Sequence, residues 1–225
     1  MDKRNVRKER RREQVREEIL DAARRVLLSG GLASLTLAAV ARELELTKAA
    51  LYHYFPSKDA LVFELVYLGL QGHAEVVGDA VANAASGADA IEALIRASAN
   101  HYGTRMDELR LAYLVPQVGR ATATPFTPEM LARLRPFNDR MYGAVAAKIR
   151  QDQQAGRVAP TIDGRRLAFL AHTAVLGMLT VEGVVAVVDD APLIHTREAM
   201  VEELVRTFTA RLGQRDETLA SRSAA

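Results

Sequence analysis

The chain places a cation, a small side chain and two aromatic hydrogen-bonding groups at helical spacing, in Lys48, Ala49, Tyr52 and His53. In duplex DNA a lysine donates to guanine edges, a methyl group contacts the methyl of thymine, and a tyrosine hydroxyl reaches a phosphate. The apolar residues of the same segment fall on the opposite face, and they are Leu46, Ala50, Leu51 and Phe55. The pattern predicts a helix that packs on one side and reads a major groove on the other.

Short helices are expected around this segment, because apolar residues recur at i, i+3, i+4 and i+7. They are predicted over residues 13–29, 36–44, 47–54 and 57–83. Gly30 and Gly31 end the first, since glycine adopts a left-handed conformation without steric cost. Thr36, Thr47 and Ser57 are the expected N-caps of the other three. Three short helices with a two-residue connection between the second and third predict a helix-turn-helix unit.

The rest of the chain is also predicted to be helical, because its apolar residues keep helical spacing and do not alternate with a period of two. Helices are expected over residues 89–105, 108–115, 128–135, 136–155, 163–188 and 196–212, with a break at Pro136. We therefore predict an all-α protein in four parts. These are a basic arm over residues 1–12, a helix-turn-helix DNA-binding domain over 13–60, a larger helical domain over 61–213, and a disordered tail over 214–225.

The composition excludes several classes of protein. The chain has 225 residues, is 49% apolar and 26% charged, and contains no cysteine, which excludes a disulfide scaffold, a zinc finger, an iron–sulfur cluster and a thiol nucleophile. No two histidines have metal-ligand spacing. The apolar stretch 174–188 contains Glu182 and is shorter than the ~20 residues that span a bilayer, and the N-terminus lacks the pattern of a secretory signal. We expect a cytoplasmic protein without a cofactor, a metal or a membrane partner.

Positive charge is concentrated at the start of the chain. Residues 1–16 contain eight lysines and arginines and three acidic residues, whereas the whole chain has a net charge of +2. Such a segment suits a polyanion, because neutralised phosphates release counterions, although a solvated tail would have the same composition. Lys58 is a further candidate for a phosphate contact. It stands in the first turn of an expected helix, where the helix dipole disfavours a cation unless an anion lies nearby.

The segment from Gly31 to Leu61, GLASLTLAAVARELELTKAALYHYFPSKDAL, resembles the DNA-binding segment of the TetR family of transcriptional regulators. The matching residues are Thr36, Val40-Ala41, Leu46-Thr47, Leu51-Tyr52, Tyr54-Phe55, Ser57-Lys58 and Leu61, within a similarity that covers roughly residues 13–65. Glu45 departs from the family, which usually has glycine in this turn. If the turn requires a positive φ, glutamate is strained there by about 1 kcal/mol.

The resemblance implies a role for each residue of this segment. Phosphates would be contacted by Thr36, Tyr52 and Lys58. The groove would be faced by Thr47, Lys48, Ala49 and His53, and Tyr54 could serve in either role. Arms of some relatives reach towards the minor groove, for which Arg10, Arg11 and Arg12 are the candidates. The expected partner is a palindromic double-stranded DNA operator, bound by a homodimer.

The resemblance also implies that the helical domain over residues 61–213 is a ligand-binding and dimerisation domain, which binds a small effector and forms the dimer. The apolar stripes expected at a four-helix interface are Leu167, Leu170, Ala171, Ala174, Met178 and Val185, together with Val201, Leu204, Val205, Phe208 and Leu212. The candidates for lining an effector pocket are His73, His101, Tyr102, Met106, Tyr113, Gln117, Phe126, Phe137, Asn138, Tyr142 and His172. Each of these residues would equally suit an ordinary hydrophobic core. Because no charged set stands out among them, an apolar or aromatic effector is favoured.

These features favour a ligand-responsive DNA-binding regulator, a repressor that its effector releases from DNA. An enzyme is disfavoured, because the chain has no glycine-rich phosphate loop, nucleophile elbow, cysteine or metal-ligand cluster. A protein-binding adaptor that has kept the fold and lost its affinity for DNA is the third hypothesis. Glu45 is the only residue that favours the adaptor.

Overall fold

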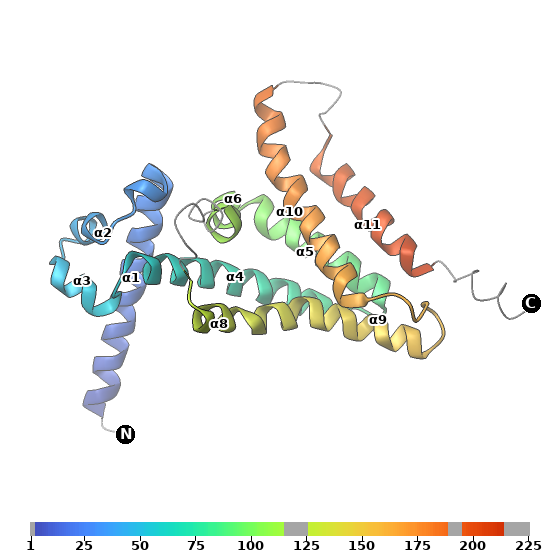
Figure 1. The fold of residues 1–225 in the computed structure, drawn as a ribbon, viewed down its shortest axis with the longest axis horizontal. Coiled ribbons are helices and arrows are strands. Elements are labelled where there is room, and N and C mark those ends of the chain that lie inside the picture. The colour runs from blue at the N-terminus through green and yellow to red at the C-terminus, as the bar shows by residue number, and fades with distance from the viewer. Residues whose placement is uncertain (1–2, 115–125, 189–194, 214–225) are drawn as a thin grey trace, which may run out of the picture. The chain divides into compact units, whose positions relative to one another are not determined.

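The computed structural model describes residues 3–114, 126–188 and 195–213, and these residues form helices and contain no strand (Figure 1). The helices are α1 (Lys3–Ser34), α2 (Leu37–Glu43), α3 (Lys48–Tyr54), α4 (Lys58–Ala82), α5 (Gly87–Gly103), α6 (Met106–Leu109), α8 (Pro128–Asn138), α9 (Ala144–Gln154), α10 (Gly164–Val188) and α11 (Arg197–Gly213). Two π-helical turns occupy Arg110–Leu114 and Asp139–Gly143. The predicted all-α fold is confirmed.

The chain divides into two compact units, each with its own core. The first comprises Met1–Gly69 with Asp107–Arg133, and the second comprises Leu70–Met106 with Leu134–Ala225. The first contains the predicted helix-turn-helix, α1 to α3, and the second contains α5, α9, α10 and α11. The predicted tail, residues 214–225, lies outside the described residues.

Helix α1 begins earlier than predicted, at Lys3 instead of residue 13. Its helical backbone is interrupted where the sequence predicts its end, at Gly31 with φ 71° and ψ −177°, and a short helical segment follows this kink to Ser34. The extension at the start has no apolar stripe, which is why periodicity did not predict it. Lysine, arginine, glutamate and glutamine are nevertheless good helix formers, and they continue the helix without packing.

The predicted N-caps are all present. Thr36, Thr47 and Ser57 accept hydrogen bonds from backbone N–H groups three residues further on, at 3.0 to 3.1 Å. Ser86 caps α5 in the same way, and Thr196 caps α11. Local chemistry therefore fixes where most helices begin, since each hydroxyl satisfies one of the N–H groups that a helix leaves without an internal partner.

The predicted break at Pro136 is wrong, because α8 continues through this residue to Asn138. Proline at this position cannot donate to the carbonyl four residues earlier, and its ring crowds that carbonyl. The π-helical turn Asp139–Gly143 follows at once and inserts one extra residue into the hydrogen-bond pattern before α9 begins. The chain therefore accommodates the proline without ending the helix.

Helix α5 lies against α9, α10 and α11 in the second unit. A β-carbon added to Gly87 would come within 2.7 Å of Ile149 Cγ1, so only glycine permits this approach of α5 to α9. Asp152 on α9 accepts a hydrogen bond from Gly87 N at 2.6 Å and forms an ion pair with Arg157. A buried carboxylate therefore holds the first turn of α5, the positive end of its dipole.

Helix α4 is long and apolar enough to cross a membrane by length and composition alone, with a mean hydropathy of 1.3 over the relevant window. Half of that window is buried inside the structure, and the helix carries the polar residues Glu64 and His73 in contact with other helices. These features are typical of a core helix.

Candidate DNA-binding surface and buried histidine cluster

Helices α2 and α3 present the threonines that the sequence assigns to DNA. Thr36 Oγ1 accepts from Ala39 N at 3.0 Å, and Thr47 Oγ1 accepts from Ala50 N at 3.1 Å, and both side chains are exposed. A hydroxyl that caps a helix uses its oxygen as the acceptor, so its hydrogen can still donate to a phosphate or a base. Capping and DNA contact are therefore compatible at both positions.

The outer face of α3 has the composition that the sequence predicts. Leu51 is fully buried in the first unit, whereas Lys48, Ala49, Tyr52 and His53 are exposed. Tyr52 keeps 46% of its surface accessible, which is high for an aromatic residue of a folded domain. Lys48 Nζ lies 5.8 Å from the centroid of the Tyr52 ring, so a cation–π contact orients the two side chains together. We name these four residues the α3 face.

Tyr54 and Lys58 lie at the edge of the α3 face. Both are half-buried, and the ring of Tyr54 meets the ring of His53 edge-on with centroids 5.7 Å apart. Lys58 is the first residue of α4, immediately after its cap Ser57. The ammonium therefore stands at the positive end of a helix of 25 residues, as the sequence indicates.

The turn between α2 and α3 has left-handed backbone at the residue where the family usually has glycine. Glu45 has φ 53°, a conformation that costs an L-residue about 1 kcal/mol. Leu46 N donates to Ala41 O at 2.8 Å and Glu45 N donates to Arg42 O at 3.2 Å, the two bonds of a Schellman motif. Glutamate therefore strains this turn locally without changing its hydrogen bonds, and the observation that favoured the adaptor loses its weight.

Arg10, Arg11 and Arg12 are exposed on the helical extension of α1. The sequence predicts an arm over residues 1–12, but from Lys3 onward the backbone is helical. An α-helix is about 10–12 Å wide, whereas the minor groove of B-DNA is about 6 Å wide. In this conformation the three arginines are not positioned as an extended arm that follows the minor groove.

The candidates for the effector pocket do not all come together. His73, His101, Tyr102, Tyr142 and His172 meet in the second unit, where all five are buried. Three others do not join them, since Tyr113 and Phe126 belong to the first unit and Asn138 is exposed. Met106 is half-buried at the start of α6. Phe137 is half-buried on α8, and Gln117 lies outside the described residues. Phe126 packs edge-on against Phe63, with ring centroids 5.2 Å apart.

The five buried residues, which we name the histidine cluster, come from α4, α5, α10 and the π-helical turn before α9. The ring of His73 is at the centre, 4.5 Å from Tyr102, 5.0 Å from His172 and 5.3 Å from His101 between centroids. His73 Nε2 is 3.0 Å from Ser98 Oγ, and Tyr142 Oη is 2.6 Å from His172 Nδ1. In the described part of the chain, His73 Nδ1 has no hydrogen-bond partner.

Burial keeps the imidazoles of His73 and His172 neutral. Burial, with smaller contributions from His172 and His101, lowers the pKa of His73 to about 2, and burial lowers the pKa of His172 to about 4. A neutral imidazole offers one donor and one acceptor, so the cluster can bind a polar group without carrying charge. Within the described residues, no three histidine or acidic side chains are arranged to hold a metal ion.

Part of the apolar stripe predicted on α10 for a dimer interface is buried inside the second unit. Leu167 and Ala171 are buried inside the second unit, because positions 167, 171, 175 and 179 point inwards. The exposed apolar residues of α10 are Phe169, Leu170 and Val181, with accessible fractions of 53%, 50% and 56%. Gly177 lies between them on the same face, and a β-carbon added there would meet nothing within 4 Å.

On α11 the predicted stripe also faces inwards: Val201, Val205 and Leu212 are buried, and Leu204 and Phe208 are half-buried. Met200 is the large apolar residue exposed in the described part of α11. Of the remaining predicted residues, Ala174 and Met178 are half-buried, and the side chain of Val185 is outside the described set. We name Phe169, Leu170, Gly177 and Val181 the outer face of α10.

Sequence reasoning missed two residues that shape these sites. Ser98 forms a hydrogen bond with His73. Its position three residues before His101, which places both side chains on one face of α5, was the sequence signal that could have identified it. Glu64 joins Arg16 and Arg133, which are 48 and 69 residues away along the chain, and no local pattern indicates such pairs.

Comparison with known proteins agrees with this geometry. Residues 19–65 match the sequence profile described as bacterial regulatory proteins, tetR family. No curated protein matches the chain. Among solved structures, a regulatory protein of the tetR family from Rhodococcus RHA1 has a TM-score of 0.63 and 15% identity, over 89% of this chain and 98% of that one.

Two further structures are similar over most of their length. PfmR, a TetR-family transcriptional regulator from Thermus thermophilus, has a TM-score of 0.59 and 20% identity, over 87% of this chain and 96% of its own. AibR, solved with isovaleryl coenzyme A and operator DNA, has a TM-score of 0.61 and 20% identity, over 85% of this chain and 96% of its own.

A helix-turn-helix followed by a larger helical unit is the architecture of the DNA-binding transcriptional regulators among these structures. Residues 19–65 match the profile of the TetR family of bacterial regulatory proteins, and the whole chain has the fold of TetR-family structures.

Proposed function

We propose that this regulator is a repressor that binds a palindromic operator as a dimer and leaves it when a small effector binds. The observation that carries the proposal is the α3 face, where Lys48, Tyr52 and His53 are exposed on a helix whose other side is buried. A helix in a major groove needs such a division, with short polar side chains towards base edges and phosphates at both margins. In this proposal Thr36, Tyr52 and Lys58 contact phosphates at the margins, and Tyr54 serves in either role. The groove is faced by Thr47, Lys48, Ala49 and His53.

A dimer follows from the outer face of α10. Phe169, Leu170 and Val181 expose apolar surface in a row, and Gly177 lets a second backbone approach closely. Two copies of α10 and α11 would form a four-helix interface, and a palindrome requires two linked α3 helices because its half-sites lie about 34 Å apart.

The effector site is proposed at the histidine cluster. Its rings are apolar in surface and neutral in charge, which favours an apolar or aromatic molecule with one hydrogen-bonding group over an ion. AibR binds both isovaleryl coenzyme A and operator DNA, so one protein of this fold holds both kinds of ligand. We assign DNA binding to residues 13–60, effector binding and dimerisation to 61–213, and the cytoplasm as the location.

Fluorescence anisotropy with a labelled duplex from upstream of the gene that encodes this chain tests the proposal. The wild type should bind this duplex at least tenfold more tightly than a scrambled duplex, and Tyr52→Ala should weaken binding at least tenfold. Leu131→Ala is the matched control, because Leu131 is as exposed as Tyr52, at 47% against 46%, but lies on α8.

Equal and weak binding of both duplexes by the wild type would contradict the repressor. If a selection from random duplexes then also yielded no preferred sequence, the adaptor would replace it. A compound that raises the melting temperature and releases the upstream duplex in the same concentration range would support the effector site.

A further inference from the structure

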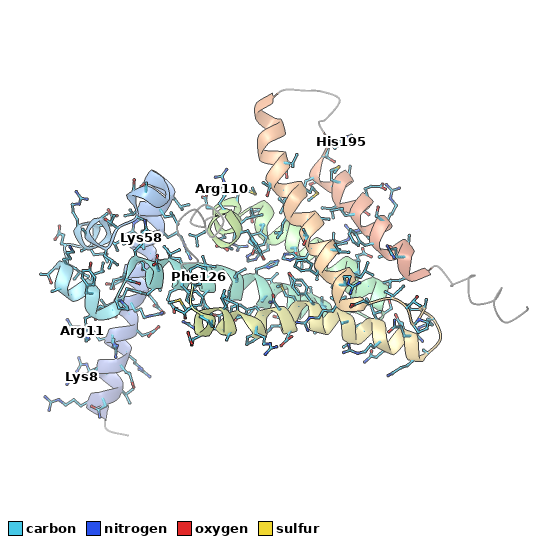
Figure 2. All side chains as sticks on the ribbon, in the orientation of Figure 1. Lys8, Arg11, Lys58, Arg110, Phe126 and His195 are labelled. Atoms are coloured by element: carbon cyan, nitrogen blue, oxygen red, sulfur yellow. The ribbon has the colours of Figure 1, made fainter. Side chains whose placement is uncertain are left out.

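The first helix carries a second charged surface, which is separate from the α3 face. Helix α1 begins at Lys3, so residues 3–12 form about 15 Å of helix. Residues 4–12 are exposed except for the half-buried Val6, and Figure 2 labels Lys8 and Arg11 among them, on the part of α1 that extends past α2 and α3.

Four of the seven bases among residues 3–12 recur at i, i+3, i+4 and i+7 and so share one face of α1. They are Arg4, Arg7, Lys8 and Arg11, which we name the basic stripe. Arg10 and Arg12 fall on other faces, and Glu9, the acidic residue among residues 3–12, falls nearly opposite the stripe. The stripe itself therefore contains no acidic residue, which suits a helix that lies against a polyanion.

The fold makes little use of the basic stripe. Within the described part of the chain, Arg7, Lys8 and Arg11 form no ion pair. Arg16, on another side of the same helix, pairs with both Glu13 and Glu64. No acidic residue occupies the first turn of α1 either, so nothing in that turn offsets the positive end of the helix dipole.

The direction of the stripe follows from helix geometry. Arg7 and Arg25 are 18 residues apart, which is five turns of α-helix, so both side chains leave α1 in the same direction. Arg25 Nε contacts Glu43 Oε1 on α2 at 3.2 Å. The basic stripe therefore lies on the side of α1 that bears the helix-turn-helix, displaced towards the N-terminus.

We propose that the basic stripe binds the phosphate backbone of the DNA beside each half-site and adds affinity without sequence preference. This inference rests on the proposed function, because the α3 face brings the DNA into reach. From Arg4 to Arg11 the stripe is about 10 Å long, and one strand of B-DNA carries a charge about every 3.4 Å along the axis, so the stripe matches about three phosphates. The width of the helix excludes the minor groove.

The test compares two double variants that remove the same charge from adjacent positions of one helix. Arg7→Gln with Arg11→Gln removes two bases of the stripe, and Arg10→Gln with Arg12→Gln removes two bases outside it. Glutamine keeps the helix propensity of arginine, and circular dichroism checks that both variants retain their helices. Binding of the upstream duplex and of its scrambled version is measured by anisotropy across a salt series.

The stripe variant should bind both duplexes more weakly by the same factor, at least tenfold at low salt. Its plot of log affinity against log salt should be shallower by about 0.9 for each lost phosphate contact, and up to about 3.6 for the dimer. The variant outside the stripe should keep the wild-type slope. Tyr52→Ala should instead lower the preference for the upstream duplex.

Equal slopes in the two double variants would overturn the inference, because net charge alone would then explain the effect. A stripe variant that loses its preference for the upstream duplex would also overturn it, because that loss indicates base readout. A wild type that binds neither duplex would overturn the proposed function and this inference together, a result distinct from the other two.

Discussion

Arg16 Nη2 on α1 lies 2.6 Å from Glu64 Oε2 on α4. The other carboxylate oxygen of Glu64 accepts from Arg133 on α8, and the guanidinium of Arg133 lies over the rings of Phe63 and Tyr67 at 5.0 and 4.4 Å. One carboxylate therefore ties the first helix of the DNA-binding region to α4 and α8. Burial raises the pKa of Glu64, but the bonds from Arg133 and Arg16 outweigh burial and hold this pKa below its usual value.

Glu64→Gln should lower the free energy of unfolding by about 2 kcal/mol, because two guanidinium groups lose a charged acceptor that is largely buried. Urea unfolding at neutral pH measures the change. Glu13→Gln is the matched control, since Glu13 also lies near Arg16, at 3.6 Å, but its side chain is 63% accessible. A solvent-exposed pair contributes less than about 1 kcal/mol. Equal losses in the two variants would show that Glu64 acts as another surface charge.

Glu45→Gly should raise the stability of the helix-turn-helix by up to about 1 kcal/mol, because it removes the strain of a positive φ at an L-residue. Gly156→Ala, in the second unit, is the control that makes the opposite change, from glycine to an L-residue at a positive φ. Gly156 has φ 69°, and an added β-carbon would meet nothing within 4 Å, so only the backbone conformation opposes the substitution. It should destabilise by about 1 kcal/mol. The midpoints of thermal unfolding measure both, and a destabilised Glu45→Gly variant would show that the carboxylate has contacts of its own.

Acid should destabilise the fold through the histidine cluster. The pKa values of His73 and His172 are lowered in the folded chain, to about 2 and about 4, so the unfolded chain binds protons first as the pH falls below about 6.5. The two neutral histidines therefore contribute their full stabilisation above about pH 6.5. Each should contribute a loss of about 2 kcal/mol between pH 7 and pH 5.

Urea titrations at pH 7 and pH 5 measure this loss, and His172→Phe should remove about half of it. His53→Gln is the control at an exposed histidine of α3 and should leave the dependence on pH in place. A wild type equally stable at both pH values would show that water or a bound molecule solvates the cluster in solution.

Local chemistry made the beginnings of helices and the α3 face predictable from the sequence. Thr36, Thr47 and Ser57 cap helices through backbone groups only three residues away, and the spacing of Lys48, Tyr52 and Leu51 alone decides which side of α3 packs. The same reasoning assigned a helix end at Pro136, where α8 instead continues to Asn138 and a π-helical turn follows.

Contacts between distant segments were not predictable in this way. The histidine cluster gathers residues from α4, α5 and α10, and nothing near any one of them in the sequence indicates the others. Contacts between distant segments also decide which apolar residues of α10 are buried. Leu167 and Leu170 are both apolar, and the position of α5 and α9 decides that the first is buried and the second exposed.

Leu170→Glu should convert the proposed dimer to a monomer, because it places a charge in the middle of the outer face of α10, where half of the leucine surface is accessible in one chain. Light scattering at micromolar concentration measures the mass, and circular dichroism checks the fold. An unpaired charge at a closed interface costs several kcal/mol, enough to weaken association at least a hundredfold. Leu131→Glu on α8, where the leucine is 47% accessible, is the control and should remain a dimer. Since a palindrome needs two linked α3 helices, the Leu170→Glu chain should also lose most of its affinity for the upstream duplex. A folded Leu170→Glu chain that remains a dimer would show that another surface forms the interface.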